Sequence, residues 1–156
     1  MITFRKIGYD NLKEITALTV EESQKSFVAT NTRSLLEAYI ALSEGNVALP
    51  FGVYADGVPV GFVMFGYGDA DGPKVAAGNY CIWRFMIDER YQKRGYGRAA
   101  LNKAIDYVRT APCGKAEYCW LSYEPENTVA KKLYASAGFQ ETGEISGGEI
   151  VAALKL

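Results

Sequence analysis

Several short runs of this chain are apolar, and residues 2–7 alternate apolar with polar positions; both patterns predict β-strands. The pair Asp56-Gly57 stands between two such runs, where it favours a two-residue hairpin turn. A second hairpin is expected to turn at Gly147-Gly148. The predicted strands cover residues 2–7, 47–55, 58–67, 80–87 and 118–123, and a glycine-rich loop is expected over residues 69–78.

Other stretches repeat their apolar residues every three or four positions, which predicts helices. In order, these are a helix with Leu12, Ile15 and Leu18 on one face after the cap Asp10, a helix from Ser34 to near Leu42, a helix over residues 97–109, and a helix over residues 127–137 with Val129, Leu133 and Ala137 on one face. Ser34 and Glu37 match a capping box, and Gly138 is expected to end the last helix. This order predicts an α/β fold in which helices flank a mixed, mostly antiparallel twisted sheet. No linker or repeat interrupts the pattern, so residues 1–156 are expected to form one domain.

The loop between the strand 80–87 and the following helix combines glycine with positive charge. Its sequence is Gln92-Lys93-Arg94-Gly95-Tyr96-Gly97-Arg98. Unpaired backbone N–H groups at a positive helix end suit a pyrophosphate, and glycines let the backbone approach it closely. The cationic side chains of this loop add further donors. The loop lacks the lysine of a Walker motif and the third glycine of a dinucleotide fingerprint, and the same pattern also occurs as a plain tight turn.

This loop and a second motif resemble the Gcn5-related N-acetyltransferase superfamily. In that family an Arg or Gln, two variable residues, Gly, one variable residue and Gly or Ala bind the pyrophosphate of acetyl-CoA, and residues 92–97 match this pattern. The second motif is matched, in order, by Asn127, Ala130, Leu133-Tyr134 and Gly138-Phe139. The resemblance covers roughly residues 2 to 156. The sequences 84–88 (Arg-Phe-Met-Ile-Asp) and 122–127 (Ser-Tyr-Glu-Pro-Glu-Asn) are similar to the bacterial spermine/spermidine acetyltransferase group.

The resemblance implies which residues hold acetyl-CoA, the expected cosubstrate. They are Phe85, Met86 and Ile87 on the strand, Gln92, Lys93, Arg94, Gly95, Tyr96, Gly97 and Arg98 in the loop, and Asn127. Edge strands pair chains in this family, which implies a homodimer.

Composition narrows the remaining classes of function. The chain has 17 Lys and Arg, 18 Asp and Glu and a net charge of −1, so it lacks the basic surface typical of nucleic-acid binding. Pro, Asp and Gly interrupt its apolar stretches, which argues against a membrane partner. It has no histidine, and its three cysteines lack Cys-x-x-Cys spacing, so neither a metal site nor a histidine-activated nucleophile is expected. We expect a cytoplasmic protein with reduced cysteines.

Acetyl transfer to an amine needs an uncharged nitrogen, a hydrogen-bonded thioester carbonyl and a proton for the leaving thiolate. The resemblance assigns the proton donor to Tyr134, although a tyrosine at this helical spacing also packs a core. Several family members carry a glutamate at the position of Trp83, and neither Trp83 nor Arg84 is a base near neutral pH. Glu124, where the sheet is expected to open, is the nearest replacement, and ordered water is the alternative.

The acceptor amine is expected to bind near the segment 21–31. The candidate carboxylates for a polyamine are Glu21, Glu22, Glu37 and Glu124, and the candidate aromatic faces are Phe27, Tyr39 and Trp83. Each glutamate also fits an ordinary role, as part of a polar helix face, a helix cap or a solvated loop. The sequence therefore predicts an acetyl-CoA-dependent N-acetyltransferase for a small cationic amine, with polyamines first. The alternatives are another amine, such as an aminoglycoside-like compound or a protein N-terminus, and an acyl-CoA-binding sensor without turnover.

Overall fold

One mixed sheet organises the chain in the computed structural model, which describes residues 1–69 and 71–156. Its strands lie in the order β1-β2-β3-β4-β5-β7-β6, and all neighbours are antiparallel except β4 and β5, which are parallel. The strands are β1 (Ile2–Lys6), β2 (Leu49–Ala55), β3 (Val58–Tyr67), β4 (Tyr80–Ile87), β5 (Tyr118–Tyr123), β6 (Gln140–Ser146) and β7 (Glu149–Lys155). This confirms the predicted α/β fold with a mixed, mostly antiparallel sheet.

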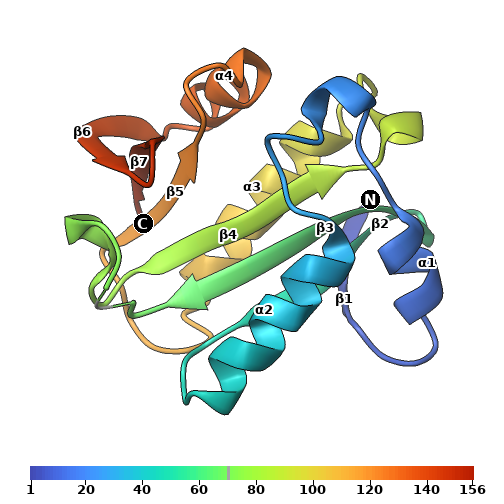
Figure 1. The fold of residues 1–156 in the computed structure, drawn as a ribbon, viewed down its shortest axis with the longest axis horizontal. Helices are drawn as coiled ribbons and strands as arrows, with labels where there is room; N and C mark the ends of the chain where they lie inside the picture. Colours follow the sequence, from blue (N-terminus) through green and yellow to red (C-terminus); the bar gives the residue numbers. More distant parts are fainter. Residues whose placement is uncertain (70) are drawn as a thin grey trace.

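Helices cover both faces of the sheet (Figure 1). They are α1 (Leu12–Ala17), α2 (Asn31–Ser43), α3 (Tyr96–Arg109) and α4 (Thr128–Ser136), with short 3₁₀ turns η1 (Glu22–Gln24), η2 (Lys74–Ala76) and η3 (Glu89–Tyr91). The helix α3 buries a stripe that includes Ala100, Leu101, Ala104 and Ile105 against one face, since these residues recur at helical spacing. Figure 1 shows α2 running along β3 on the opposite face, and α2 also contacts β2. No helix in the described ranges has the length and apolar character that a membrane crossing requires.

The hairpin turns follow the prediction closely. Asp56 and Gly57 both have positive φ, at 48° and 83°, as a two-residue type I′ turn requires. Gly147 and Gly148 have φ of 56° and 82° and join β6 to β7 in the same way. The predicted strand from residue 47 instead begins at Leu49, because the preceding residues form a loop after α2.

The beginnings of the first two helices differ from the prediction. Asn11, not Asp10, is the N-cap of α1, and its side chain accepts a hydrogen bond from the Gly8 N–H, whereas Asp10 pairs with Arg5. The helix α2 begins at Asn31, three residues before the predicted capping box. Thr30 is its cap and accepts from the Arg33 N–H. Thr30 lies one helical turn before Ser34, the predicted cap. Both residues can cap a helix, and the structure uses the earlier one.

One residue of the predicted apolar face of α4 was misplaced, whereas Leu133 and Ala137 pack against the core as predicted. Val129 is 70% exposed, whereas Tyr134 is buried and Ala130 packs against the same core. Gly138 ends the helix with φ of 102°, as predicted. The side of α4 that faces the core therefore carries Ala130, Leu133, Tyr134 and Ala137, and Val129 lies outside it.

Candidate active site

The strands β4 and β5 separate soon after they begin. They pair only at Tyr80 with Cys119 and at Cys81 with Trp120. Beyond this point, in the part of the chain that the structure describes, β4 pairs only with β3, and β5 pairs only with β7. The two strands therefore diverge, as Figure 1 shows. Backbone groups on the facing edges then have no partner strand and are available to an extended ligand. We call this opening the split.

The predicted phosphate loop lies where β4 leads into α3. Gly95 is the N-cap of α3 and has φ of 84°, a conformation that glycine adopts without strain. No side chain caps the first turn of α3 within the described residues, so its N–H groups remain free for an anion. Lys93, Arg94 and Arg98 are exposed around this turn, and Tyr96 packs its ring toward the core.

Gly97 has no packing reason to be glycine. A Cβ at this position would lie 3.8 Å from Leu133 Cδ2 and 3.9 Å from Ile87 Cγ1, which are ordinary contacts. Its backbone is helical, where glycine is the less stable choice. Packing and backbone conformation therefore do not require glycine at this position, and close approach by a ligand stays the prediction from the sequence.

Gln92 joins the loop to η1 instead of extending toward an anion. Its side-chain Nε2 donates to Ile87 O at 2.9 Å and to Gln24 Oε1 at 2.8 Å, and its Oε1 accepts from Gln24 Nε2 at 3.2 Å. Both of its N–H groups are thereby used. The side chain of Gln92 therefore links the loop to η1 and to the end of β4. The sequence predicted it as a cofactor contact.

Asp88 makes a second link of this kind. It is buried, and it accepts hydrogen bonds from the Thr19 N–H and from the backbone and guanidinium of Arg90. Burial alone raises the pKa of Asp88, but the hydrogen bonds from Arg90 and Thr19 outweigh that effect and leave the pKa below its ordinary value. The connection after α1 is thus tied to the end of β4.

The other predicted cofactor residues lie along the split. Phe85 and Ile87 pack toward the face covered by α3, and Met86 is buried on the face covered by α2. The side chain of Asn127 caps α4 by accepting from the Ala130 N–H at 3.3 Å. The strand thus supplies a backbone edge at the split.

Tyr134 lies on α4 and packs its ring against Tyr123 and Phe139, at centroid distances of 5.7 and 6.1 Å. Burial raises the pKa of Tyr134 well above its ordinary value, and the charge of Glu149 and the neighbouring Tyr123 add to the shift. The phenol is therefore protonated at neutral pH, which is the state of a proton donor. The structure shows the packing role, and the donor role is compatible with it.

The side chain of Trp83, at the expected position of the base, packs against the core beneath α2. It is the extra residue of a β-bulge, since Ile82 and Arg84 pair with consecutive residues of β3. The guanidinium of Arg84 pairs with Glu37, which also lies 3.8 Å from Arg33. Glu37 is therefore neither the predicted cap nor a free carboxylate for an ammonium group. Glu124 is half-buried one residue beyond β5.

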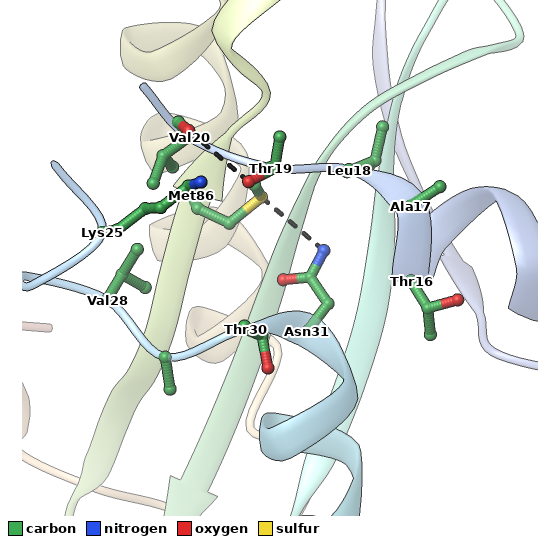
Figure 2. A pocket seen from close by; sticks show the side chains of 11 residues that line it. Thr16, Ala17, Leu18, Thr19, Val20, Lys25, Val28, Thr30, Asn31 and Met86 are labelled. Atoms are coloured by element: carbon green, nitrogen blue, oxygen red, sulfur yellow. Dashed lines mark hydrogen bonds between the residues drawn. The ribbon is translucent and has the colours of Figure 1, made fainter. Parts of the chain in front are cut away.

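The segment predicted to bind the amine surrounds a cavity of about 280 Å³ (Figure 2). The charged side chain that lines it is Lys25, beside the hydroxyls of three threonines, and Met86 accepts a weak hydrogen bond from Asn31 there. Glu21, Glu22, Phe27 and Tyr39 do not line it. Glu22 is 88% exposed and pairs with Lys25 at 2.6 Å. This cavity does not suit an ammonium group.

A second cavity, of about 290 Å³, suits a cation better. It lies where β4 and β5 begin, on the face covered by α2, and Trp83, Trp120, Tyr67 and Asp69 line it. The two tryptophans and the carboxylate are groups that attract an alkylammonium, whereas the ring of Tyr67 packs on Tyr80 toward the opposite face. Sequence reasoning identified only Trp83 among them, since the others come from two further strands and a loop.

A further acidic side chain, Glu149, lies near the split. It begins β7, and its Oε1 accepts from Ser122 Oγ on β5 at 2.8 Å. Sequence reasoning missed it, although its place directly after the Gly147-Gly148 turn marks it as the first residue of the final strand.

Three comparisons with known proteins agree with this geometry. The chain is 32% identical to a spermine/spermidine N(1)-acetyltransferase of Bacillus subtilis (strain 168) over 156 residues, which is 99% of each chain. Its fold is similar to that of an aminoglycoside acetyltransferase in complex with coenzyme A, with a TM-score of 0.78, 15% identity and coverage of 99% and 95%. It is also similar to a spermidine N-acetyltransferase of Vibrio cholerae in complex with CoA and spermine, with a TM-score of 0.69, 22% identity and coverage of 99% and 94%. Residues 12–139 match the model of the acetyltransferase (GNAT) family, and the chain therefore belongs to that family.

Proposed function

We propose that this acetyltransferase uses acetyl-CoA to acetylate a primary amine of a small cationic substrate, a polyamine first. The observation that carries the proposal is the split between β4 and β5, with a glycine-containing cationic loop at the end of β4. The name of the Bacillus subtilis relative supports the substrate class.

The backbone and the loop divide the recognition of acetyl-CoA between them. The N–H groups at the start of α3, with Lys93, Arg94 and Arg98, hold the pyrophosphate. The open edge of β4 along Phe85–Ile87 offers backbone hydrogen bonds to the extended pantetheine arm. The thioester then lies in the split, where a side chain from either diverging strand can reach it.

The reaction requires a proton acceptor for the ammonium and a proton donor for the leaving thiolate. An alkylammonium with a pKa near 10 costs roughly 4 kcal/mol to deprotonate at pH 7, so a carboxylate or ordered water must take its proton. Tyr134 then donates a proton to the departing thiolate. Glu124, at the end of β5, is the carboxylate that sequence reasoning favours for the first step.

The second cavity, lined by Trp83 and Trp120 and called the aromatic cavity below, holds the rest of the substrate. Trp83 and Trp120 flank its methylene groups, and Asp69 pairs with a remote ammonium. Among the described residues, no carboxylate lines the cavity beside Lys25, and it is not part of this binding mode.

The test is to measure CoA release from acetyl-CoA with a panel of amines. The panel contains spermidine, spermine, a monoamine of similar length, an aminoglycoside and a short peptide with a free N-terminus. We expect turnover with spermidine and spermine, with kcat/KM above that of the monoamine. Turnover of only the aminoglycoside or only the peptide would show that this compound, rather than a polyamine, represents the substrate class. Tight CoA binding without turnover of any amine would identify an acyl-CoA sensor.

A further inference from the structure

We propose that Glu149, held in place by Ser122, is the catalytic base that removes a proton from the acceptor ammonium. This inference rests on the proposed function and replaces Glu124 as the proton acceptor. Neither residue type nor sequence position suggested it, because it depends on how β7 lies beside the diverging half of β5.

The register of β5 and β7 determines which face Glu149 occupies. Ser122 pairs with Val151, and Trp120 pairs with Ala153, without a register shift. Because alternate residues of a strand share a face, Glu149 and Val151 point to the same side as Ser122 and Trp120. Trp120 and Val151 pack together there, beside Cys81 of β4.

Ser122 also places the carboxylate along the strand. Ser122 lies two residues beyond Trp120, the last β5 residue that pairs with β4, so it belongs to the diverging part of β5. Its hydroxyl donates to Glu149 Oε1 at 2.8 Å. That bond uses one oxygen and leaves Oε2 for a proton.

The charge of Glu149 acts on groups from both sides of the split. Burial is the main cause that raises the pKa values of Tyr134, on α4, and Cys81, on β4, and the negative charge of Glu149 adds to both shifts. The neighbouring carboxylate of the final hairpin, Glu144 of β6, accepts from the Lys74 backbone N–H at 3.1 Å and is engaged there, and Lys155 shares this face at the far end of β7. The charge of Glu149 therefore reaches both the helix that carries the predicted proton donor and the strand that the thioester would follow.

The other acidic candidates fit the role less well. Glu37 is paired with Arg84, and Glu22 is paired with Lys25. Glu124 lies past the end of β5 with no hydrogen bond to its side chain among the described residues. A base needs a defined position relative to the reacting nitrogen, and Glu149 has such a position.

The proposed step balances as follows. The ammonium gives one proton to Glu149, and the freed nitrogen lone pair forms a bond to the thioester carbonyl carbon. The carbon–sulfur bond then breaks, and the thiolate takes a proton from the Tyr134 hydroxyl. The new amide nitrogen loses its second proton as the phenolate regains one, and Glu149 releases its proton to solvent. The products are the N-acetylated amine, CoA and one proton.

The experiment compares Glu149→Gln with Glu117→Gln, the same change at an exposed position before β5. With spermidine at pH 7, we expect Glu149→Gln to lower kcat/KM by about 100-fold, within the range for general base catalysis. Because this variant can use only amine that is already neutral, its deficit should shrink by up to about tenfold per pH unit toward the amine's pKa near 10. Glu117→Gln should match the unsubstituted protein at every pH.

Ser122→Ala provides a second, milder variant. It keeps the carboxylate but removes the hydrogen bond that positions it, so we expect a smaller loss with the same pH trend. Acetyl-CoA affinity, measured for each variant, reports whether the site remains folded. A Glu149→Gln rate within about twofold of the unsubstituted protein, or an equal loss at all pH values, would overturn the assignment. Absence of turnover by the unsubstituted protein would instead overturn the proposed function, and this inference with it.

Discussion

At the scale of single residues, the same side chain often serves packing and chemistry together. Tyr134 is buried among aromatic rings, yet its protonated hydroxyl lies on the helix that flanks the split. The sequence offered Glu37 as a helix cap and as a substrate carboxylate, whereas in the structure it forms an ion pair with Arg84. The role of such a side chain depends on which charged or aromatic groups lie next to it in the folded protein, and not on its residue type alone.

Replacing Tyr134 with phenylalanine tests its chemical role without removing the ring. We expect kcat to fall by roughly 10- to 1000-fold while acetyl-CoA affinity changes little, since the substitution removes one proton donor. Tyr107→Phe is the matched control, because it removes a hydroxyl from another aromatic cluster, between α3 and the sheet. If both variants keep kcat within about twofold, Tyr134 is a packing residue.

At the scale of elements, the loop before α3 is supported from behind by η1 and by the segment after α1. The paired amides of Gln24 and Gln92 join η1 to the loop, and Asp88 accepts from the Thr19 N–H. These contacts hold the start of α3 beside the end of β4 before any ligand binds. The cationic side chains of the loop are then free to face an anion.

The variant Gly97→Val tests whether the loop binds acetyl-CoA, because it should weaken ligand binding without destabilising the fold. Valine is the better helix former, and its Cβ has ordinary contacts here, so the thermal midpoint should not fall. We expect the KM for acetyl-CoA to rise by about tenfold or more, because the side chain occupies space that the pyrophosphate approaches. Ala99→Val, an exposed position in the same helical turn, should leave KM unchanged. An unchanged KM in the folded Gly97 variant would exclude the loop from the site.

At the scale of the whole molecule, the distribution of charge bears on the substrate more than the net charge of −1 does. The carboxylates expected near the amine divide into those paired with lysine or arginine, Glu22 and Glu37, and those near the split, Glu124 and Glu149. Asp69 adds a charge to the aromatic cavity. A substrate with several ammonium groups would span these separate acidic positions.

The preference for polyamines should therefore depend on salt. Between about 0.1 M and 1 M ionic strength the Debye length falls from about 10 Å to about 3 Å, which weakens attraction between partly exposed charges. We expect the ratio of kcat/KM for spermidine to that for a monoamine to shrink over this range. Asp69→Asn and Glu124→Gln should lower the ratio, whereas Glu22→Gln should not, because Glu22 is already paired with Lys25. A ratio that is independent of salt would contradict the polyamine assignment and leave the acetyltransferase family unaffected.

Local chemistry explains why much of the fold was predictable. The strands 80–87 and 118–123 were predicted at their observed bounds, and the Asp-Gly turn, the glycine at the end of α4 and the loop before α3 each depend on residues within a few positions. The errors arose where local signals competed. Thr30 and Ser34 both suit a helix start, and Val129 lies in the first turn of α4, where helical spacing alone placed it on the core face although it is exposed.

The sequence alone determined the order of the elements and the motifs that indicated the family, because hydrophobic period and turn chemistry act over short distances. Only the tertiary structure decided which charged groups are free. It paired Glu37 with Arg84, turned Gln92 back onto Gln24, and brought Ser122 and Glu149 together across two strands. Such contacts join residues far apart along the chain, and their partners are chosen by the register of the sheet and the packing of its faces. The positions that bear on the proposed chemistry are therefore the ones that a linear sequence specifies least directly.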